Sequence, residues 1–278
     1  MNNITIGLAQ TIQTADLSRN RETIFRFMDQ ASEAGVDILC FPESQTVGYR
    51  VDITAADFPC PERELDALHK EVARRCANNN MSCILGTETP IVDRKPYNSA
   101  LVIDNEGSIL GRHHKTRLTP LDALAYSPGD DMSTYMLSGI QVGVVICYEG
   151  FRYAETTASC VEQGAQLIFH PQNNTTRPND WKIPIHHALI VSRAAENTVW
   201  FASCNACFSV HQNSRSMIVC PDGTIDSQLE LGQEALLVSE IDIDKATRAM
   251  FRYDMSDTAE ILFRDTVKSH ELKPARND

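Results

Sequence analysis

Three reactive side chains each follow a short apolar run of the kind that forms a β-strand. They are a carboxylate, an ammonium and a thiol: Glu43, Lys115 and Cys147. Open α/β sheets build their sites at strand ends, so we expect the three groups to meet at one edge of the sheet. A thiolate attacks a carbonyl carbon, a carboxylate carries the proton between thiol and leaving amine, and an ammonium stabilises the oxyanion. Hydrolysis through an acyl-enzyme requires these groups.

The run before Cys147 is the most informative strand in the chain. Residues 142–146 are all apolar or glycine and show no polar alternation, which is typical of a strand buried on both faces. A helical pattern follows over residues 152–163. The thiol would then lie near a helix N-terminus, where unpaired N–H groups and the helix dipole favour the thiolate. The alternative is a buried strand cysteine without chemistry.

Strands and helices follow one another along the whole chain. Residues 98–104 and 108–113 flank a short turn and predict a hairpin. The other expected strands are 4–9, 36–41, 82–87, 167–170, 198–204, 214–220 and 234–243, and the expected helices are 18–34, 61–78, 181–197 and 244–251. No Pro/Gly/Ser-rich linker divides the chain. We therefore expect one domain over residues 1–278, with a core at about 4–243 and a C-terminal tail at about 244–278.

Two segments have the same pattern. Residues 34–42 and 163–171 both read as helix end, glycine, small residue, polar residue, four strand residues and proline. An internal repeat of a strand–helix–strand unit would explain the similarity. It would place Glu43 and the region of Asn173 at equivalent ends of two neighbouring strands.

Composition and charge exclude several classes of function. The net charge of −12 disfavours nucleic-acid and anionic membrane surfaces as partners. No apolar run approaches the ~20 residues of a membrane span, and the N-terminus lacks the pattern of a signal peptide. The nine cysteines are odd in number and often lie in apolar runs, as reduced thiols do. We expect a cytoplasmic protein without a membrane partner.

Two other patterns are weak indications of metal or redox chemistry. His113-His114 and His186-His187 are adjacent pairs whose side chains point in different directions, and no carboxylate cluster accompanies them. Cys204 and Cys207 have CxxC spacing but no second pair and no thioredoxin-like setting. We therefore expect no metal, and a redox thiol protein remains a weaker alternative.

Four stretches in order resemble the nitrilase, or carbon–nitrogen hydrolase, superfamily. They are Phe-Pro-Glu at 41–43, Arg-His-His-Lys-Thr-Arg-Leu at 112–118, Val-Ile-Cys-Tyr-Glu at 145–149 and Ser-Arg-Ala-Ala-Glu-Asn at 192–197. The resemblance covers residues 4–243. It implies a four-layer α-β-β-α sandwich, association into homodimers or higher homo-oligomers to which the tail could contribute, and no cofactor.

The resemblance also implies a role for each residue of the triad. Cys147 would be the nucleophile, Glu43 the general base and Lys115 the oxyanion stabiliser, with the backbone N–H of Tyr148 as a second oxyanion donor. Family members commonly carry a second glutamate where this chain has Asp122. The aspartate is one methylene shorter, so its reach to Lys115 stays open.

Other positions have less definite roles. The family's arginine and glutamate after the nucleophile correspond to Arg152 and Glu155, one residue further along than usual, so the turn after the cysteine could differ. Glu149 and Asn173 are candidate substrate contacts, with scaffold roles as the alternative. Residues 196–197 would support the fold, and the loops 49–60, 118–132 and 172–181 would line the pocket and set specificity.

The sequence therefore predicts a hydrolase of non-peptide carbon–nitrogen bonds. The expected substrate is a small amide or N-carbamoyl compound, which would form a thioester with Cys147. A nitrilase acting on a nitrile, or a catalytically silent scaffold of the same fold, is the alternative. Isochorismatase-like hydrolases also use an acid, a lysine and a cysteine, but their early acid is an aspartate, whereas here it is Glu43.

Overall fold

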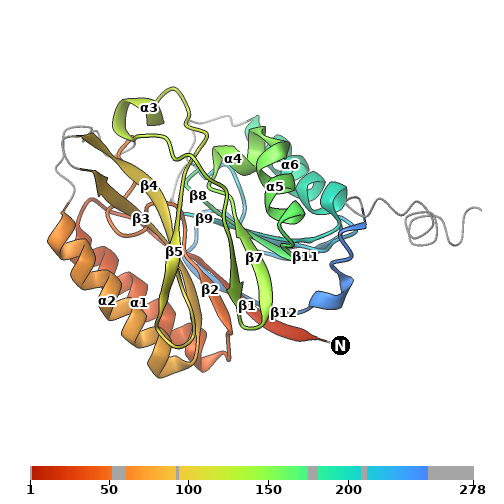
Figure 1. Cartoon of the computed structure of the whole chain (residues 1–278), viewed down its shortest axis with the longest axis horizontal. Helices are drawn as coiled ribbons and strands as arrows, with labels where there is room; N and C mark the ends of the chain where they lie inside the picture. Colours follow the sequence, from red (N-terminus) through yellow and green to blue (C-terminus); the bar gives the residue numbers. More distant parts are fainter. Residues whose placement is uncertain (1, 52–60, 92–93, 175–180, 208–211, 250–278) are drawn as a thin grey trace, which may run out of the picture.

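The computed structural model describes residues 2–51, 61–91, 94–174, 181–207 and 212–249. Within these residues, two six-stranded sheets lie face to face and helices cover their outer faces (Figure 1). The expected four-layer α-β-β-α sandwich is confirmed. No helix of the described part combines the length and apolar character needed to cross a membrane.

The first sheet has the strand order β12-β1-β2-β3-β4-β5. Its strands are β1 (Asn3–Gln10), β2 (Ile38–Cys40), β3 (Ser82–Ile91), β4 (Arg94–Ile103), β5 (Ile109–His114) and β12 (Ala235–Asp242). Strands β1, β2 and β3 run parallel, while β3, β4 and β5 are antiparallel neighbours. The predicted hairpin is therefore β4–β5, and β3 extends it by one more antiparallel strand.

The second sheet has the order β11-β10-β9-β8-β7-β6. Its strands are β6 (Thr134–Leu137), β7 (Ile140–Val144), β8 (Leu167–Gln172), β9 (Trp200–Asn205), β10 (Met217–Val219) and β11 (Ile225–Gln228). Strands β7, β8 and β9 are parallel. Both sheets thus have a parallel centre whose carboxyl ends carry loops.

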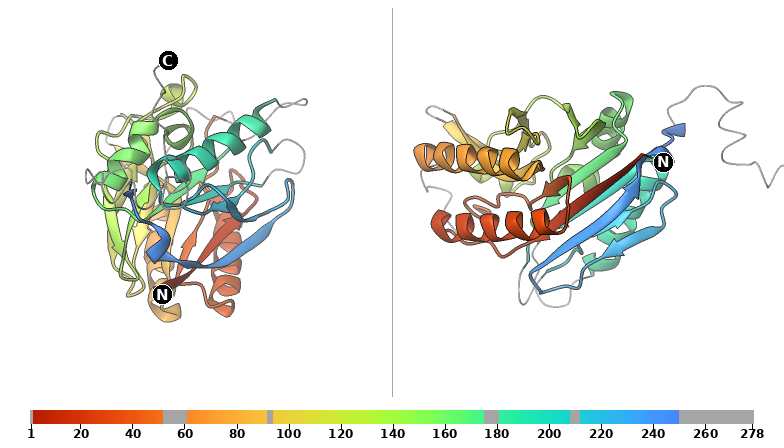
Figure 2. Two further views of the ribbon diagram at one scale, coloured as in Figure 1. Left: turned by 90° about the vertical axis from the view of Figure 1, so that its right-hand side faces the viewer. Right: turned by 90° about the horizontal axis from the view of Figure 1, so that it is seen from below.

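Two pairs of helices form the outer layers. The helices are α1 (Leu17–Glu33), α2 (Glu62–Asn79), α3 (Asp122–Ala125), α4 (Tyr148–Arg152), α5 (Ala154–Glu162) and α6 (Lys182–Asn197), with a 3₁₀ turn η1 at Ile243–Lys245. Helices α1 and α2 lie side by side on the first sheet, and α5 and α6 cover the second (Figures 1 and 2). The Asp16 side chain caps α1 by accepting from the Ser18 N–H at 2.9 Å.

The layered architecture explains why the strand runs lack polar alternation. In the segment around β2, Ile38 and Cys40 join the core between the sheets, while Leu39 and Phe41 pack with α1 and α2. Successive side chains of a strand point to opposite faces, and here both faces are covered. An apolar residue is therefore favoured at every position.

The internal repeat is present, but its two halves are not neighbours in one sheet. Strands β1 and β2 form a parallel pair linked by α1, and β7 and β8 form a second parallel pair linked by α4 and α5. Strands β2 and β8, however, belong to different sheets. The prediction of neighbouring strands at a single sheet edge was wrong, because each unit contributes to its own sheet and the two sheets stack through their apolar faces.

Several element boundaries also differ from the prediction. Strand β7 ends at Val144, and the helical region begins at Tyr148 as two short helices that meet at Tyr153. Near the C-terminus the structure has η1 where a helix over 244–251 was expected, and the tail beyond residue 249 lies outside the described residues. The short elements β6, β11 and α3 were not predicted, since none spans more than four residues.

Candidate active site

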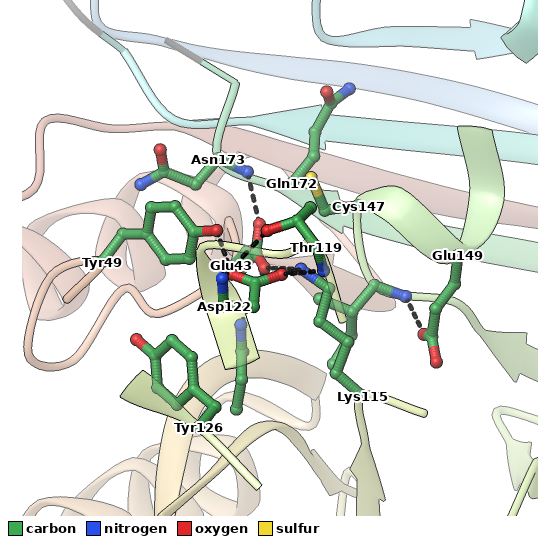
Figure 3. A network of polar contacts seen from close by, with 12 residues as sticks. Glu43, Tyr49, Lys115, Thr119, Asp122, Tyr126, Cys147, Glu149, Gln172 and Asn173 are labelled. Atoms are coloured by element: carbon green, nitrogen blue, oxygen red, sulfur yellow. Dashed lines mark hydrogen bonds and ion pairs between the residues drawn. The ribbon is translucent and has the colours of Figure 1, made fainter. Parts of the chain in front are cut away.

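The predicted triad comes together at the carboxyl ends of strands from both sheets. Glu43 follows β2, Lys115 follows β5 in the same sheet, and Cys147 lies between β7 and α4 of the facing sheet. Figure 3 shows the three side chains converging from these elements. Lys115 Nζ donates to Glu43 Oε1 at 2.7 Å.

The Glu43 carboxylate is almost fully buried, with 1% of its surface exposed. Besides Lys115, the Asn98 side chain donates to Oε1 at 2.7 Å, and the Asn173 backbone N–H donates to Oε2 at 2.9 Å. Burial raises the pKa of Glu43 above its usual value, although the charge of Lys115 opposes the rise. A raised pKa makes this carboxylate a stronger proton acceptor at neutral pH.

Lys115 is fully buried between two carboxylates. Its backbone N–H donates to Asn98 O at 2.8 Å, and its carbonyl accepts from Gly129 N at 2.9 Å. A Cβ on Gly129 would lie 2.3 Å from His114 O, so only glycine allows this close approach. Burial alone would lower the pKa of Lys115, but the charge of Glu43 and other neighbours holds that pKa well above its usual value.

Asp122 does reach Lys115, which answers the question that its short side chain left open. Its Oδ2 accepts from Lys115 Nζ at 2.9 Å and from the Thr119 N–H at 2.9 Å. The Tyr49 hydroxyl donates to Oδ1. Thr119 Oγ1 in turn accepts from the Asp122 N–H at 3.0 Å, which fixes the start of α3. Burial opposes ionisation, but Lys115 holds the pKa of Asp122 below its usual value.

Cys147 occupies a strained turn between β7 and α4. Its φ of 48° and ψ of −103° are unusual for a residue with a side chain, and such conformations often occur at functional sites. The Cys147 N–H donates to Pro171 O at 2.9 Å, and its carbonyl accepts from Phe151 N at 3.2 Å. These backbone bonds present the thiol toward Glu43 and Lys115.

The surroundings of Cys147 favour the protonated thiol, whereas its place near a helix N-terminus was expected to favour the thiolate. Burial raises the pKa of Cys147 well above its usual value, and the negative charge of Glu43 raises it further, while Lys115 lowers it. Helix α4 has five residues, and the thiol is 7% exposed. Burial and the charge of Glu43 therefore favour the neutral thiol, and its proton must leave when the sulfur attacks a substrate.

Sequence reasoning placed Asn174 in an expected pocket loop, 172–181, but gave it no role of its own. Its side-chain Nδ2 donates to Cys147 Sγ at 3.3 Å. Sequence reasoning also gave no role to Tyr49 and Thr119, which bond Asp122, or to Asn98, which bonds Glu43. Asn174 lies in a Gln-Asn-Asn-Thr-Thr stretch. Nothing in that stretch singles out Asn174 among the residues of the loop.

Glu149 holds two parts of the site together. The carboxylate is fully buried, and it accepts from the Thr116 N–H and hydroxyl at 2.6 and 2.7 Å, from the Ile146 N–H at 2.6 Å and from His113 Nε2 at 2.8 Å. Burial alone would raise the pKa of Glu149, but His113 and these hydrogen-bond donors lower that pKa to about 2. Figure 3 shows Glu149 apart from the cluster around Glu43. The geometry favours a scaffold role.

Two other predicted residues lie beside the triad. The Asn173 backbone bonds Glu43, while its side chain donates to Gln13 Oε1 at 2.7 Å. Tyr148 is the first residue of α4, and its ring packs edge-on against Tyr153 with centroids 5.4 Å apart. The Tyr148 backbone N–H is at the helix start beside Cys147.

The other patterns noted in the sequence lie in the scaffold. His114 Nδ1 bonds Ser99 Oγ at 2.8 Å, and His186 stacks on Phe151 at 4.2 Å. The Cys204 thiol donates to Cys40 O at 3.3 Å. Among the described residues, no three His, Cys, Asp or Glu side chains are grouped to hold a metal ion.

The remaining expectations concern the segments around the site. Arg193 joins the Glu196 carboxylate at 2.7 Å and the Gly150 carbonyl at 2.9 Å, and Asn197 donates to Arg193 O at 2.9 Å. This supports α4 from α6, as a fold-supporting role requires. Glu155 forms a 3.7 Å ion pair with Arg117. Residues 52–60 and 175–180 of the expected pocket loops lie outside the described residues.

A model of the carbon–nitrogen hydrolase family matches residues 5–250. The chain belongs to this family. An (R)-stereoselective amidase from Pseudomonas sp. is 28% identical over 225 residues, with 78% of this chain and 77% of that protein covered. An omega-amidase from Homo sapiens is 27% identical, with 92% of this chain and 97% of that protein covered.

The fold is shared with solved amidase structures. A variant of the amidase from Nesterenkonia sp. AN1, with the acetamide moiety of fluoroacetamide added covalently at the active site cysteine, superposes with a TM-score of 0.76. It is 21% identical, and the comparison covers 92% of this chain and 95% of that chain.

Proposed function

We propose that this chain is an amidase that hydrolyses small primary amides through a thioester on Cys147. The observation that carries the proposal is the buried cluster in which one ammonium contacts two carboxylates beside a protonated thiol. The names of the relatives, amidase and omega-amidase, support the same reaction. Glu43 is the base, Lys115 the oxyanion stabiliser and Cys147 the nucleophile.

Acylation begins with transfer of the thiol proton to Glu43 as sulfur attacks the carbonyl carbon. The new S–C bond pushes an electron pair onto the carbonyl oxygen, which Lys115 and the Tyr148 N–H stabilise. When the oxyanion collapses, the C–N bond breaks and Glu43 gives its proton to the leaving nitrogen. Ammonia departs and Cys147 carries the acyl group as a thioester.

Deacylation repeats these steps with water. Glu43 takes a proton from water as the water oxygen attacks the thioester carbon. The C–S bond then breaks, the proton returns to Cys147 and the carboxylic acid leaves. The same carboxylate thus serves twice as base and twice as acid, which suits its raised pKa.

The surrounding residues hold these groups in place. Asp122 Oδ2 accepts a hydrogen bond from Lys115 Nζ at 2.9 Å, and its negative charge favours the charged form of the lysine. The Asn173 N–H holds the Oε2 end of Glu43. Glu149 fixes the chain after Lys115 to the turn before Cys147, so it acts as a support and not as a substrate contact.

Ammonia release from a panel of small amides, N-carbamoyl compounds and nitriles tests the proposal. Wild type should release ammonia from amides and Cys147→Ala should not. Cys220→Ala is the matched control, because Cys220 is a half-buried free thiol outside the site. Glu43→Gln should slow proton transfer, and intact-protein mass spectrometry should reveal any thioester that accumulates. No ammonia from any amide, or full activity in Cys147→Ala, would contradict the proposal.

The same proposal extends to the state of the protein in the cell. We expect a single domain over residues 1–278 that acts in the cytoplasm as a homodimer or higher homo-oligomer. The family match over 5–250 supports one domain, and the free thiols in the described residues suit a reducing compartment. Light scattering after gel filtration measures the assembly, and cell fractionation measures the location.

A further inference from the structure

A side-chain amide outside the predicted triad contacts the reactive sulfur. Asn174 Nδ2 lies 3.3 Å from Cys147 Sγ, within the range for a hydrogen bond to sulfur. The Asn174 backbone is fixed from two sides, because its N–H donates to Asn205 Oδ1 at 2.8 Å and its carbonyl accepts from the Asn213 N–H at 3.2 Å. The amide is therefore held at the thiol by the scaffold.

A chain of hydrogen bonds fixes which end of the Asn174 amide faces the sulfur. Cys147 O can only accept, so the Nε2 of His170, 2.9 Å away, carries the proton. Burial lowers the pKa of His170 to about 3, so the ring is neutral and Nδ1 must accept from the Ser203 hydroxyl at 2.9 Å. Ser203 Oγ then accepts from Gln172 Nε2 at 2.6 Å. Gln172 Oε1 is left to accept from Asn174 Nδ2 at 2.7 Å.

This circuit begins and ends on Cys147. Turning the Gln172 amide over would set its oxygen against Ser203 Oγ, whose one proton is already donated to His170. Turning the Asn174 amide over would set its oxygen against Gln172 Oε1. Both amides therefore have one orientation, and Asn174 presents an N–H donor to the sulfur.

We propose that Asn174 is a catalytic hydrogen-bond donor that stabilises the Cys147 thiolate as it forms, and that the circuit through Gln172, Ser203 and His170 fixes its orientation. This inference rests on the proposed function for its catalytic meaning. The donor is uncharged, so it stabilises the thiolate without forming an ion pair with Glu43. Glu43 therefore stays available to accept the thiol proton.

The charges around the thiol explain why such a donor is needed. The ionisable groups that act on it are Glu43, Asp122, Tyr49 and Lys115. Two carboxylates and burial disfavour the thiolate, and one ammonium favours it. The backbone N–H of residue 173 also favours it. An additional donor at the sulfur acts in the same direction as the ammonium.

Alkylation by iodoacetamide at pH 7.5 measures the effect without any substrate. Removing a hydrogen bond to a charged group should raise the thiol pKa by about one to two units. A higher pKa also makes the remaining thiolate more nucleophilic, which offsets about half of the loss. Asn174→Ala should therefore alkylate Cys147 about three- to tenfold more slowly, as measured by peptide mass spectrometry, and its rate–pH profile should move to higher pH.

Two further variants test the circuit and the specificity of the effect. Gln172→Met leaves the Asn174 amide in place but releases its orientation, so we expect a smaller decrease in the same direction. Asn105→Ala is the matched control, because Asn105 donates to Asn80 Oδ1 on an exposed turn away from the site, and its alkylation rate should equal the wild type. If Asn174→Ala does not fold, Asn174→Leu keeps the side-chain volume without the donor.

An Asn174→Ala rate within twofold of wild type, or a faster rate, would overturn the proposal. A faster rate is the result expected if Asn174 only shields the thiol. A Gln172→Met rate equal to wild type would overturn the role of the circuit. Alkylation needs no turnover, so a chain that released no ammonia would contradict the proposed function and leave this test unaffected.

Discussion

Replacing Asp122 with asparagine should move the pH dependence of activity to lower pH. The substitution keeps the shape of the side chain and removes one of the two negative charges on Lys115. The charge of Asp122 raises the pKa of Glu43 and of the Cys147 thiol. In the proposed mechanism Glu43 acts as a base only when ionised, so activity should be lost as the pH falls through its pKa. Without the repulsion that pKa is lower, and activity persists to lower pH.

The geometry sets the size of the shift. One oxygen of each carboxylate bonds Lys115 Nζ, at 2.7 and 2.9 Å, so the two oxygens lie no further apart than about 5.6 Å. At that separation and an effective dielectric constant of about 20, two unit charges interact by about 3 kcal/mol. This corresponds to about two pKa units, and the higher dielectric constant of water would reduce it to about half a unit.

The assay is the pH profile of kcat/KM for ammonia release from the best amide. We expect the acidic limb of Asp122→Asn to lie about one unit below that of the wild type, with a lower maximum because Lys115 loses a charged partner. Asp130→Asn is the matched control, since it removes the same charge from an exposed position in the same loop. An acidic limb that stayed in place or moved to higher pH would refute the electrostatic reasoning.

Two other substitutions have definite outcomes. In Gly86→Ala the new Cβ would lie 1.9 Å from Pro42 O, next to Glu43. The substitution should reduce the free energy of unfolding by about 1–3 kcal/mol and lower kcat. Thermal melting measures the first effect and ammonia release measures the second. Glu149→Gln should lower the free energy of unfolding in urea by about 1–3 kcal/mol, because the new amide N–H group would point at hydrogen-bond donors and have no acceptor. The low pKa of Glu149, about 2 against 4.5, stabilises the fold above pH 4.5. The wild type should lose that advantage over Glu149→Gln as the pH falls toward 2, measured by unfolding at each pH.

The sequence was sufficient for the order of most strands and helices, but the four-residue elements β6, β11 and α3 gave no recognisable pattern. Strand runs covered on both faces are apolar throughout, and α1 and α2 have regular helical periodicity with clear boundaries. The three reactive side chains could be found because each lies within three residues of the end of a strand. The apolar runs alone could not show how the two sheets face one another, since the run around Ile38 and Cys40 is compatible with a helix layer or a second sheet on either face. The four-layer arrangement was predicted from the family resemblance.

Burial and tertiary contacts decided the features that the sequence left open or missed. Local sequence suggested a stabilised thiolate at Cys147, but desolvation by the folded core raises its pKa instead. The reach of Asp122 depends on α3, a four-residue helix without a sequence signal of its own. Asn174 takes its position from β9 and the segment before β10, more than thirty residues away in the sequence.

The placement of the triad on two sheets also affects how active molecules can be counted. The first sheet carries Glu43 and Lys115, and the second carries Cys147. A chain in which only one sheet has formed holds either a base and a cation or an isolated thiol. An unactivated amide acylates a thiol only with a base and an oxyanion donor beside it. On the proposed mechanism, a thioester therefore forms from an amide only when the sheets dock, and the number of Cys147 residues acylated by an amide counts correctly folded molecules in a preparation.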